Sequence, residues 1–273
     1  MDDTSGPLFC EYRRAAPSAP TVLLLHGLTA SHASWRPIAD RLPEFNLVIP
    51  DLLGFGDSPK PDCSYDLETH CAALRPIVEQ SWPALVVGHS MGAVVALGLV
   101  ARYPSIATAI LLSPTLFANH AEAVELMHSA PLMQRMTVRW TGLAHLACSV
   151  ACALRPLTKT IAPFLVRDLP PDVVRAGFDH TWTSYSRSLA ELVVSGLGPR
   201  LLASHGSRAV LIHGLKDPTV PLELALRYRS LVARFETVEG DHEALLKNPE
   251  PIAHIIQEVA QAPAALSDLT PGD

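Results

Sequence analysis

The stretch of sequence that decides the fold is LVVGHSMGAVVALGLVARYP, which covers residues 85–104. Residues 84–87 are all apolar and predict a buried parallel strand that leads into this stretch. Residues 93–103 predict a helix that ends before a proline. Between them, GHSMG fits the pattern G-x-S-x-G, with Ser90 at its centre. A strand, a sharp turn with a central serine and a helix are the setting in which this pattern positions a nucleophile.

The two glycines of the pattern have a steric reason. Ser90 must adopt a strained backbone conformation to expose its Oγ, and side chains at Gly88 and Gly92 would collide with the crossing helix. The alternative is a glycine-rich turn whose serine is merely solvated. The apolar strand before the turn and the helix after it favour the nucleophile.

Size and charge limit the class of protein. With 273 residues, the chain fits one domain with an insertion, or two small domains. A hydrophobic share of 48% suits a sheet whose central strands are covered on both faces. The net charge of −6 and the lack of a basic run argue against a nucleic-acid partner.

The five cysteines form no C-x-x-C pair, so we expect no disulfide framework and a reducing compartment. Cys148 and Cys152 share a helix face, which favours buried small side chains over metal ligands. The acidic start, MDDTSGPL, has no apolar segment typical of a signal peptide. Residues 142–154 are too few to span a bilayer, so we expect a cytoplasmic protein without stable membrane insertion. The oligomeric state stays open.

Strand and helix patterns alternate along the chain. Apolar strands are expected at residues 21–25, 47–50, 84–87, 106–112, 209–213 and 234–238, with a short edge strand at residues 8–13. Strands that are apolar on both faces and separated by helices predict an α/β fold with a doubly wound, mostly parallel sheet.

The strand pattern is lost over residues 115–204, which are helix-like and rich in Met, Trp, Leu and Ala. We interpret this segment as a helical cap over the carboxyl edge of the sheet, where open α/β sheets bind ligands. Residues 1–114 and 205–262 then form the two parts of the core. Residues 263–273 are expected to be a disordered tail.

Five blocks in one order carry a resemblance to a known family. They are LLLHGLTASHASW, DLLGFGDS, VVGHSMG, LIHGLKDPTVP and VEGDHEALLKNPE, between residues 21 and 250. The chain resembles the α/β-hydrolase fold family, whose catalytic residues follow the order Ser…Asp…His. It departs at its start, because only one strand is visible where the family usually has a hairpin.

This resemblance implies Ser90 as nucleophile, His242 as base and Asp217 as the acid that orients it. His242 follows the last expected strand, and Asp217 follows the strand at residues 209–213. Asp241 is adjacent to His242 and is therefore badly placed to bond its Nδ1. The alternatives are a solvated loop histidine at His242 and a turn carboxylate at Asp217.

The resemblance also places the oxyanion donors at the backbone N–H groups of Leu28 and Met91. For the nearby Thr29 hydroxyl we expect a bond to its own turn rather than to substrate. Apolar candidates for the wall of the substrate pocket are Trp35, Met133, Trp140 and Trp182, with a plain core role as the alternative for each.

The serine narrows the expected chemistry, because haloalkane dehalogenases and epoxide hydrolases of this fold carry aspartate at this turn. We expect a serine hydrolase that cleaves an ester, thioester or lactone with an apolar acyl part through an acyl-enzyme. Its partner is then an apolar small-molecule substrate, and this interpretation implies no metal and no cofactor. Within enzymes, the alternative is C–C bond hydrolysis, or acyl transfer and cyclisation, with the same residues. From another class, the alternative is a ligand receptor on this fold.

Overall fold

The computed structural model describes residues 6–127 and 132–261, with the side chains of Met133, Gln134 and Val138 also outside the description. Seven strands form one sheet in the order β1-β3-β2-β4-β5-β6-β7. The strands are β1 (Cys10–Arg13), β2 (Thr21–Leu25), β3 (Asn46–Pro50), β4 (Leu85–His89), β5 (Thr108–Leu112), β6 (Ala209–Gly214) and β7 (Arg234–Val238). The first is an antiparallel edge strand, and the other six pair in parallel. This confirms the predicted fold class.

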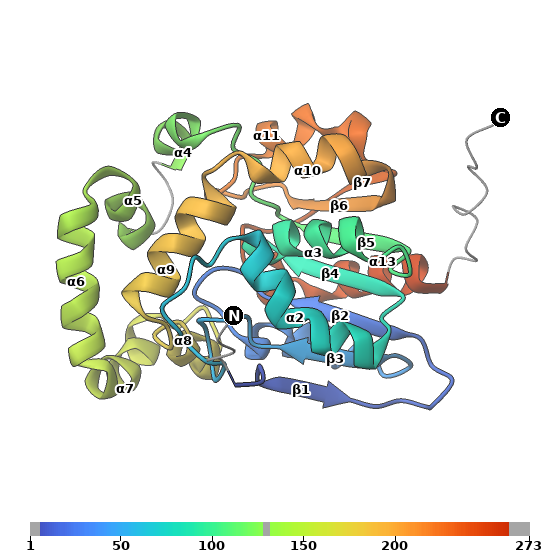
Figure 1. Ribbon diagram of the computed structural model, residues 1–273, viewed down its shortest axis with the longest axis horizontal. Coiled ribbons are helices and arrows are strands. Elements are labelled where there is room, and N and C mark those ends of the chain that lie inside the picture. Colours follow the sequence, from blue (N-terminus) through green and yellow to red (C-terminus); the bar gives the residue numbers. More distant parts are fainter. Residues whose placement is uncertain (1–5, 128–131, 262–273) are drawn as a thin grey trace.

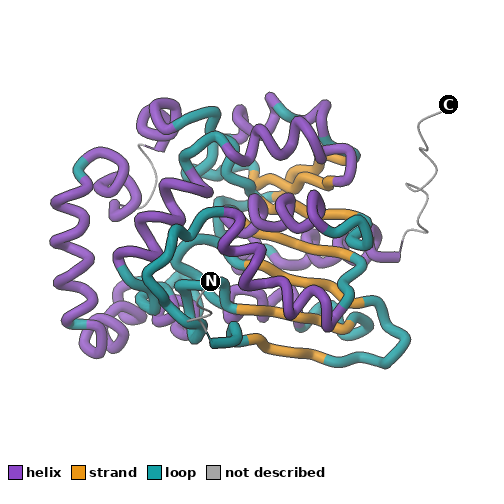
Figure 2. Tube along the Cα trace, viewed as in Figure 1, coloured by secondary structure: helices purple, strands orange, loops and turns teal. Residues whose placement is uncertain are grey.

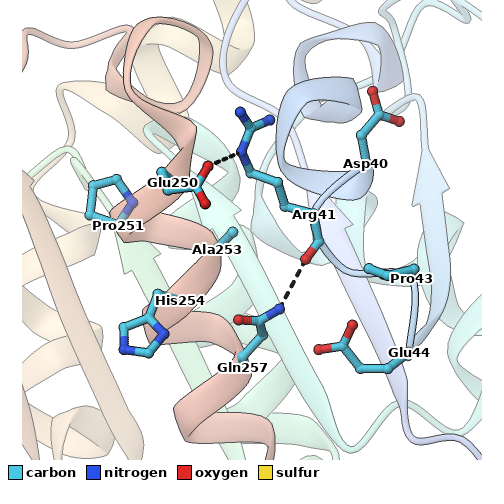
Figure 3. A pocket seen from close by; sticks show the side chains of 9 residues that line it. All are labelled: Asp40, Arg41, Pro43, Glu44, Glu250, Pro251, Ala253, His254 and Gln257. Carbon is cyan, nitrogen blue, oxygen red and sulfur yellow. Dashed lines mark hydrogen bonds and ion pairs between the residues drawn. The ribbon is translucent and has the colours of Figure 1, made fainter.

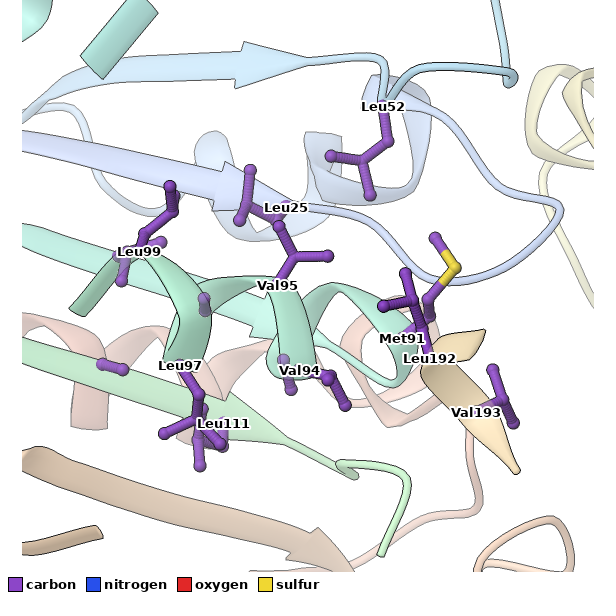
Figure 4. Packing of buried hydrophobic residues seen from close by; sticks show 14 of the residues in the cluster. Leu25, Leu52, Met91, Val94, Val95, Leu97, Leu99, Leu111, Leu192 and Val193 are labelled. Carbon is purple, nitrogen blue, oxygen red and sulfur yellow. The ribbon is translucent and has the colours of Figure 1, made fainter. Parts of the chain in front are cut away.

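Helices cover both faces of the sheet (Figure 1), and the buried side chains of its strands divide between two cores. In β2, Leu23 and Leu25 join the core formed with α2 (Leu67–Ser81), α3 (Met91–Arg102) and α10 (Leu197–His205). Figure 4 shows Val95 of α3 beside Leu25. On the other face, Leu24 joins the core formed with α1 (Arg36–Ala39), α12 (Ala244–Lys247) and α13 (Pro249–Gln261). The sheet is therefore covered on both sides, as its apolar strands require.

Most of the helices that follow β5 lie beyond the carboxyl ends of the parallel strands (Figures 1 and 2). They are α4 (His120–Leu126), α5 (Leu132–Arg139), α6 (Thr141–Ala153), α7 (Arg155–Leu165), α8 (Pro171–Ala176) and α9 (Trp182–Ser188), which runs into a π-helical turn, η3 (Leu189–Val193). The described part of residues 115–204 contains no strand. The last helix of this segment, α10, packs on α3 of the core. The predicted boundary at residue 204 therefore falls inside a helix that covers the sheet.

Short elements complete the molecule. They are the 3₁₀ turns η1 (His32–Trp35), η4 (Gly206–Arg208) and η5 (Arg229–Leu231), and helix α11 (Leu222–Arg227). Ser31 caps the amino terminus of η1, where its hydroxyl accepts from the Ala33 N–H. The predicted tail at residues 263–273 lies outside the described residues.

Candidate active site

Ser90 lies between β4 and α3 with φ 53° and ψ −116°, a strained backbone conformation for a residue with a side chain. A Cβ on Gly88 would lie 2.2 Å from the carbonyl oxygen of Gly92, in the first turn of α3. A Cβ on Gly92 would lie 2.4 Å from the carbonyl oxygen of Leu25, at the end of β2. The glycines thus let a helix and a neighbouring strand close around the serine. The predicted collision with the helix holds for Gly88, whereas Gly92 faces the strand.

A chain of two hydrogen bonds leads away from Ser90. The serine Oγ lies 3.0 Å from Nε2 of His242, and Nδ1 of the same ring lies 2.7 Å from Oδ2 of Asp217. The other carboxylate oxygen, Oδ1, accepts from the backbone N–H groups of Thr219 and Val220 at 2.8 and 2.9 Å. An ionised Asp217 selects the tautomer with a proton on Nδ1, which leaves Nε2 free to accept the serine proton.

The electrostatics of this pair agree with its geometry. Burial favours the neutral imidazole, but the carboxylate of Asp217 outweighs it, so the pKa of His242 is raised. Burial also acts to raise the pKa of Asp217. The charge and hydrogen bond of His242 and the backbone donors prevail, and that pKa is lowered. The carboxylate therefore stays ionised and stabilises an imidazolium at His242.

Three further histidines near the site have structural bonds. His89 donates from Nε2 to the carbonyl oxygen of His242 at 2.9 Å, which fixes the backbone of the histidine that bonds Ser90. Burial lowers the pKa of His89 to about 3, so this ring stays neutral. His26 accepts from the Leu52 N–H, and His213 donates to the carbonyl oxygen of Val220.

The two candidate oxyanion donors lie at the ends of β2 and β4. Met91 is the first residue of α3, where the helix dipole favours an anion. A Cβ on Gly27 would lie 3.2 Å from the Ser90 Cβ, so the chain that leads to Leu28 passes close to the serine. The Thr29 hydroxyl donates to the Leu28 carbonyl at 2.7 Å, as expected. Among the described residues, neither the Leu28 nor the Met91 N–H has a hydrogen-bond partner.

A cavity of about 460 Å³ opens above Ser90, between the sheet edge and the helical segment. Its floor carries Ser90 and His242, and its wall is mostly apolar. The wall residues from the helical segment and the loops that join its helices are Cys148, Ala151, Cys152, Val166, Leu169, Val173, Val174, Gly177, Phe178, His180 and Tyr185. A cavity of this size, with few polar groups at one end, suits a small apolar ligand.

The predicted wall residues need correction. Trp35 is fully buried in the core beneath the other face of the sheet, and Trp140 is 60% exposed. Trp182 stacks on His145 and touches Tyr185, behind the wall. None of these three side chains lines the cavity. The Met133 side chain lies outside the described residues. Aromatic type alone does not indicate direction, which here depends on the packing of the helices.

Sequence reasoning missed the groups that do line the cavity. The inward face of α6 carries the buried Ala144 and the wall residues Cys148 and Ala151, at the spacing of one helix face. Glu243, next to His242, also lines the cavity, and burial raises the pKa of its carboxyl. The Sγ atoms of Cys148 and Cys152 lie 3.9 Å apart, and all five cysteines are free thiols.

A second hollow, of about 670 Å³, lies between α13 and the chain that follows α1, and it shares no residue with the first (Figure 3). Arg41 there pairs with Glu250, and its carbonyl accepts from Gln257. Within the described ranges, no cluster of His, Cys, Asp and Glu has the make-up of a metal site. Nor is any helix in those ranges long and apolar enough to cross a membrane.

Known proteins resemble the chain in sequence. A model of the alpha/beta hydrolase fold matches residues 20–249. Lipase LipV of Mycobacterium tuberculosis is 35% identical over 126 residues, which are 44% of this chain and 48% of the lipase. A haloalkane dehalogenase of Bradyrhizobium diazoefficiens is 36% identical over 116 residues, which are 37% of each chain. The matches thus span about half the length of these relatives, or less.

Solved structures share the whole architecture. The enol-lactonase of Burkholderia xenovorans LB400 superposes with a TM-score of 0.68 over 93% of this chain and 98% of that chain. Its sequence identity of 17% shows likeness of fold alone. The family model, in contrast, spans most of the sequence, including the blocks around Ser90 and His242. The chain belongs to the alpha/beta hydrolase fold family.

Proposed function

We propose that the protein is a serine hydrolase that cleaves an ester, thioester or lactone with an apolar acyl part. The observation that carries this proposal is the chain of hydrogen bonds Ser90–His242–Asp217 at the floor of an apolar cavity. A sequence relative named as a lipase supports the same reaction class. A serine where dehalogenases of this fold carry aspartate favours acyl chemistry over dehalogenation.

In the proposed first step, the Ser90 Oγ attacks the carbonyl carbon of the substrate while His242 Nε2 takes the hydroxyl proton. The oxygen of the tetrahedral intermediate carries the negative charge and accepts from the N–H groups of Leu28 and Met91. The C–O or C–S bond then breaks, and the leaving group takes the proton from His242. An acyl-enzyme remains on Ser90.

In the second step, His242 removes a proton from water, and the resulting hydroxyl attacks the acyl-enzyme carbonyl. Collapse of the second intermediate returns the proton to Ser90 and releases the acid. Asp217 stabilises the imidazolium in both steps without becoming protonated itself. The residues 115–204 act as a cap in this proposal, because their side chains exclude water from the cavity and thereby strengthen the oxyanion contacts.

The proposal is tested with p-nitrophenyl butyrate and a fluorophosphonate probe. We expect a burst of p-nitrophenol, steady turnover and labelling of one serine, located at Ser90 by mass spectrometry. Ser90→Ala should lower turnover by a factor of about 10⁶ and abolish labelling. Ser64→Ala, at an exposed serine, serves as the matched control and should change neither.

A chain that binds such esters saturably without a burst or turnover would contradict the proposal and favour a ligand receptor. Labelling of another serine by an active Ser90→Ala variant would contradict the assignment of the nucleophile. Hydrolysis of the C–C bond of a β-diketone, without turnover of esters, would favour C–C bond hydrolysis.

A further inference from the structure

Two consecutive helices of the segment that covers the cavity expose apolar ridges. On α6, Leu143, Leu146 and Val150 recur at spacings of three and four residues and are 55%, 63% and 51% exposed. The opposite side of the same helix carries the buried Ala144 and Cys148. The helix thus has one apolar stripe toward the cavity and a second one toward the outside. A helix of a globular domain needs only the first.

Helix α7 also exposes an apolar ridge, and none of its residues is buried. Its exposed apolar side chains are Leu157, Ile161, Phe164 and Leu165, of which Phe164 is 68% and Leu165 78% exposed. These four and the three of α6 together are named the outer ridge. Figure 1 shows α6 at the outer margin of the molecule, far from the sheet, with α7 following directly. Large apolar side chains gathered in this way on a protein surface mark an interaction site.

The charged residues within the segment that carries the outer ridge are all basic, with Glu125 and Asp168 at its two ends. Residues 126–167 contain five Lys or Arg and no Asp or Glu, in a chain whose net charge is −6. Lys159 is neutralised by Asp179 at 2.6 Å. Arg139 before α6 and Arg167 after α7 are exposed and form no ion pair with a described residue. An apolar helix face bordered by arginines is the pattern of a helix that lies in a lipid–water interface.

We propose that the outer ridge docks on the surface of a lipid bilayer with anionic headgroups. The apolar side chains enter the boundary between headgroups and acyl chains, and Arg139 and Arg167 meet the headgroup phosphates. The ridge leads to the cavity, because Val166 directly follows α7, is 38% exposed and lines the cavity wall. A docked molecule thus holds its cavity close to lipid-dissolved substrates.

The charges favour a lipid surface over a second copy of the chain. Two outer ridges packed face to face would bring the basic segments of both copies together, without an acidic residue in residues 126–167 to offset them. An anionic bilayer supplies that offset, with each basic residue near the surface worth about a fivefold change in binding.

The test is co-sedimentation of the full chain with vesicles, carried out on Ser90→Ala so that lipid turnover plays no part. We expect binding to vesicles of phosphatidylcholine with 30% phosphatidylglycerol and at least about tenfold weaker binding to phosphatidylcholine alone. Binding should fall in 1 M NaCl, where the screening length shortens from about 10 to about 3 Å.

The variant Leu146→Glu/Phe164→Glu should lose vesicle binding, and Arg139→Gln should weaken it about fivefold. Leu226→Glu, at a 40% exposed leucine of α11, is the matched control and should bind as before. The same substitutions are also made in the chain that retains Ser90. Its hydrolysis of a short, water-soluble ester reports whether each variant folds.

Absence of binding to either vesicle would overturn the proposal. So would binding that the double substitution leaves unchanged. A dimer in solution that Leu146→Glu/Phe164→Glu converts to monomer, without vesicle binding by the wild-type ridge, would assign the ridge to a second copy instead.

Discussion

Asp217 and Asp241 lie close to the same histidine but bond different groups. Asp217 bonds the His242 ring at 2.7 Å, whereas Asp241 accepts from the Glu243 N–H and pairs with Lys247 at 2.6 Å. Asp217→Asn should therefore lower turnover of p-nitrophenyl butyrate about 10³–10⁴-fold, because it misorients the imidazole and removes its compensating charge. Asp241→Asn, the matched control, should cost less than about tenfold. The reverse ranking would place the orienting acid at Asp241.

The pH profile separates an electrostatic role of Asp217 from a merely structural one. His242 acts as a base only when neutral, and the carboxylate raises its pKa above the ordinary 6.5. The ratio kcat/KM of the wild type should thus fall on the acidic side, with a midpoint above that value. In Asp217→Asn the residual activity should have its midpoint at lower pH. An unchanged midpoint would show that the charge does not act on His242.

Among single residues, positions that depend on the order of the chain could be predicted from the sequence. The direction in which a side chain points could not. Ser90, Asp217 and His242 each follow a strand, and the structure brings their side chains within hydrogen-bond distance. The type of residue alone indicates a wall position for Trp140, but it lies between α5 and α6 and its side chain is exposed. Glu243 was missed because a carboxylate on a loop gives no sign of burial.

Among the elements, the turn from β4 into α3 tolerates the least change. Gly92 is the second residue of α3, and an added Cβ would meet backbone atoms at 2.4 Å. Gly92→Ala should lower the free energy of unfolding by about 3 kcal/mol or more, since neither the strand nor the helix has room to move. Gly142 holds the same second position in α6, and a Cβ there meets nothing within 4 Å.

Gly142→Ala is therefore the matched control and should raise stability by about 0.5 kcal/mol, because alanine loses less entropy in a helix. Urea unfolding of both variants measures the two changes. Equal effects at the two glycines would mean that the close approach at the turn contributes nothing to stability.

Strands and helices could be predicted from the sequence where their burial permits only one pattern of apolar residues. Strands β2 and β4 are apolar on both faces, which only a covered parallel sheet allows. In the helical segment the pattern is ambiguous, because α6 has apolar side chains facing outward as well as inward, and no residue of α7 is buried. The inward stripe could therefore not be distinguished from the outer ridge before the helices were placed.

For the whole molecule, we propose that the position of the helical segment over the carboxyl edge of the sheet decides which substrates reach Ser90. The cavity depends on both parts, since the sheet edge supplies the reactive groups and α6 to α9, with the loops between them, supply most of the apolar wall. Selectivity for acyl length should thus change with wall residues and leave the chemistry intact. On this proposal, a long acyl chain occupies the space beside the small wall residues of α6.

Ala151 of α6 lines the cavity, whereas Ala153 two residues later is exposed. In Ala151→Leu, kcat/KM for p-nitrophenyl decanoate should fall at least about tenfold relative to the acetate, because each methylene excluded from an apolar pocket costs 10-fold or more. The acetate is too short to reach α6, so its rate should change little. Ala153→Leu makes the same substitution on the same helix and should leave the profile unchanged. If both variants keep the wild-type profile from acetate to decanoate, the acyl chain does not lie against α6, and selectivity must come from the sheet side of the cavity.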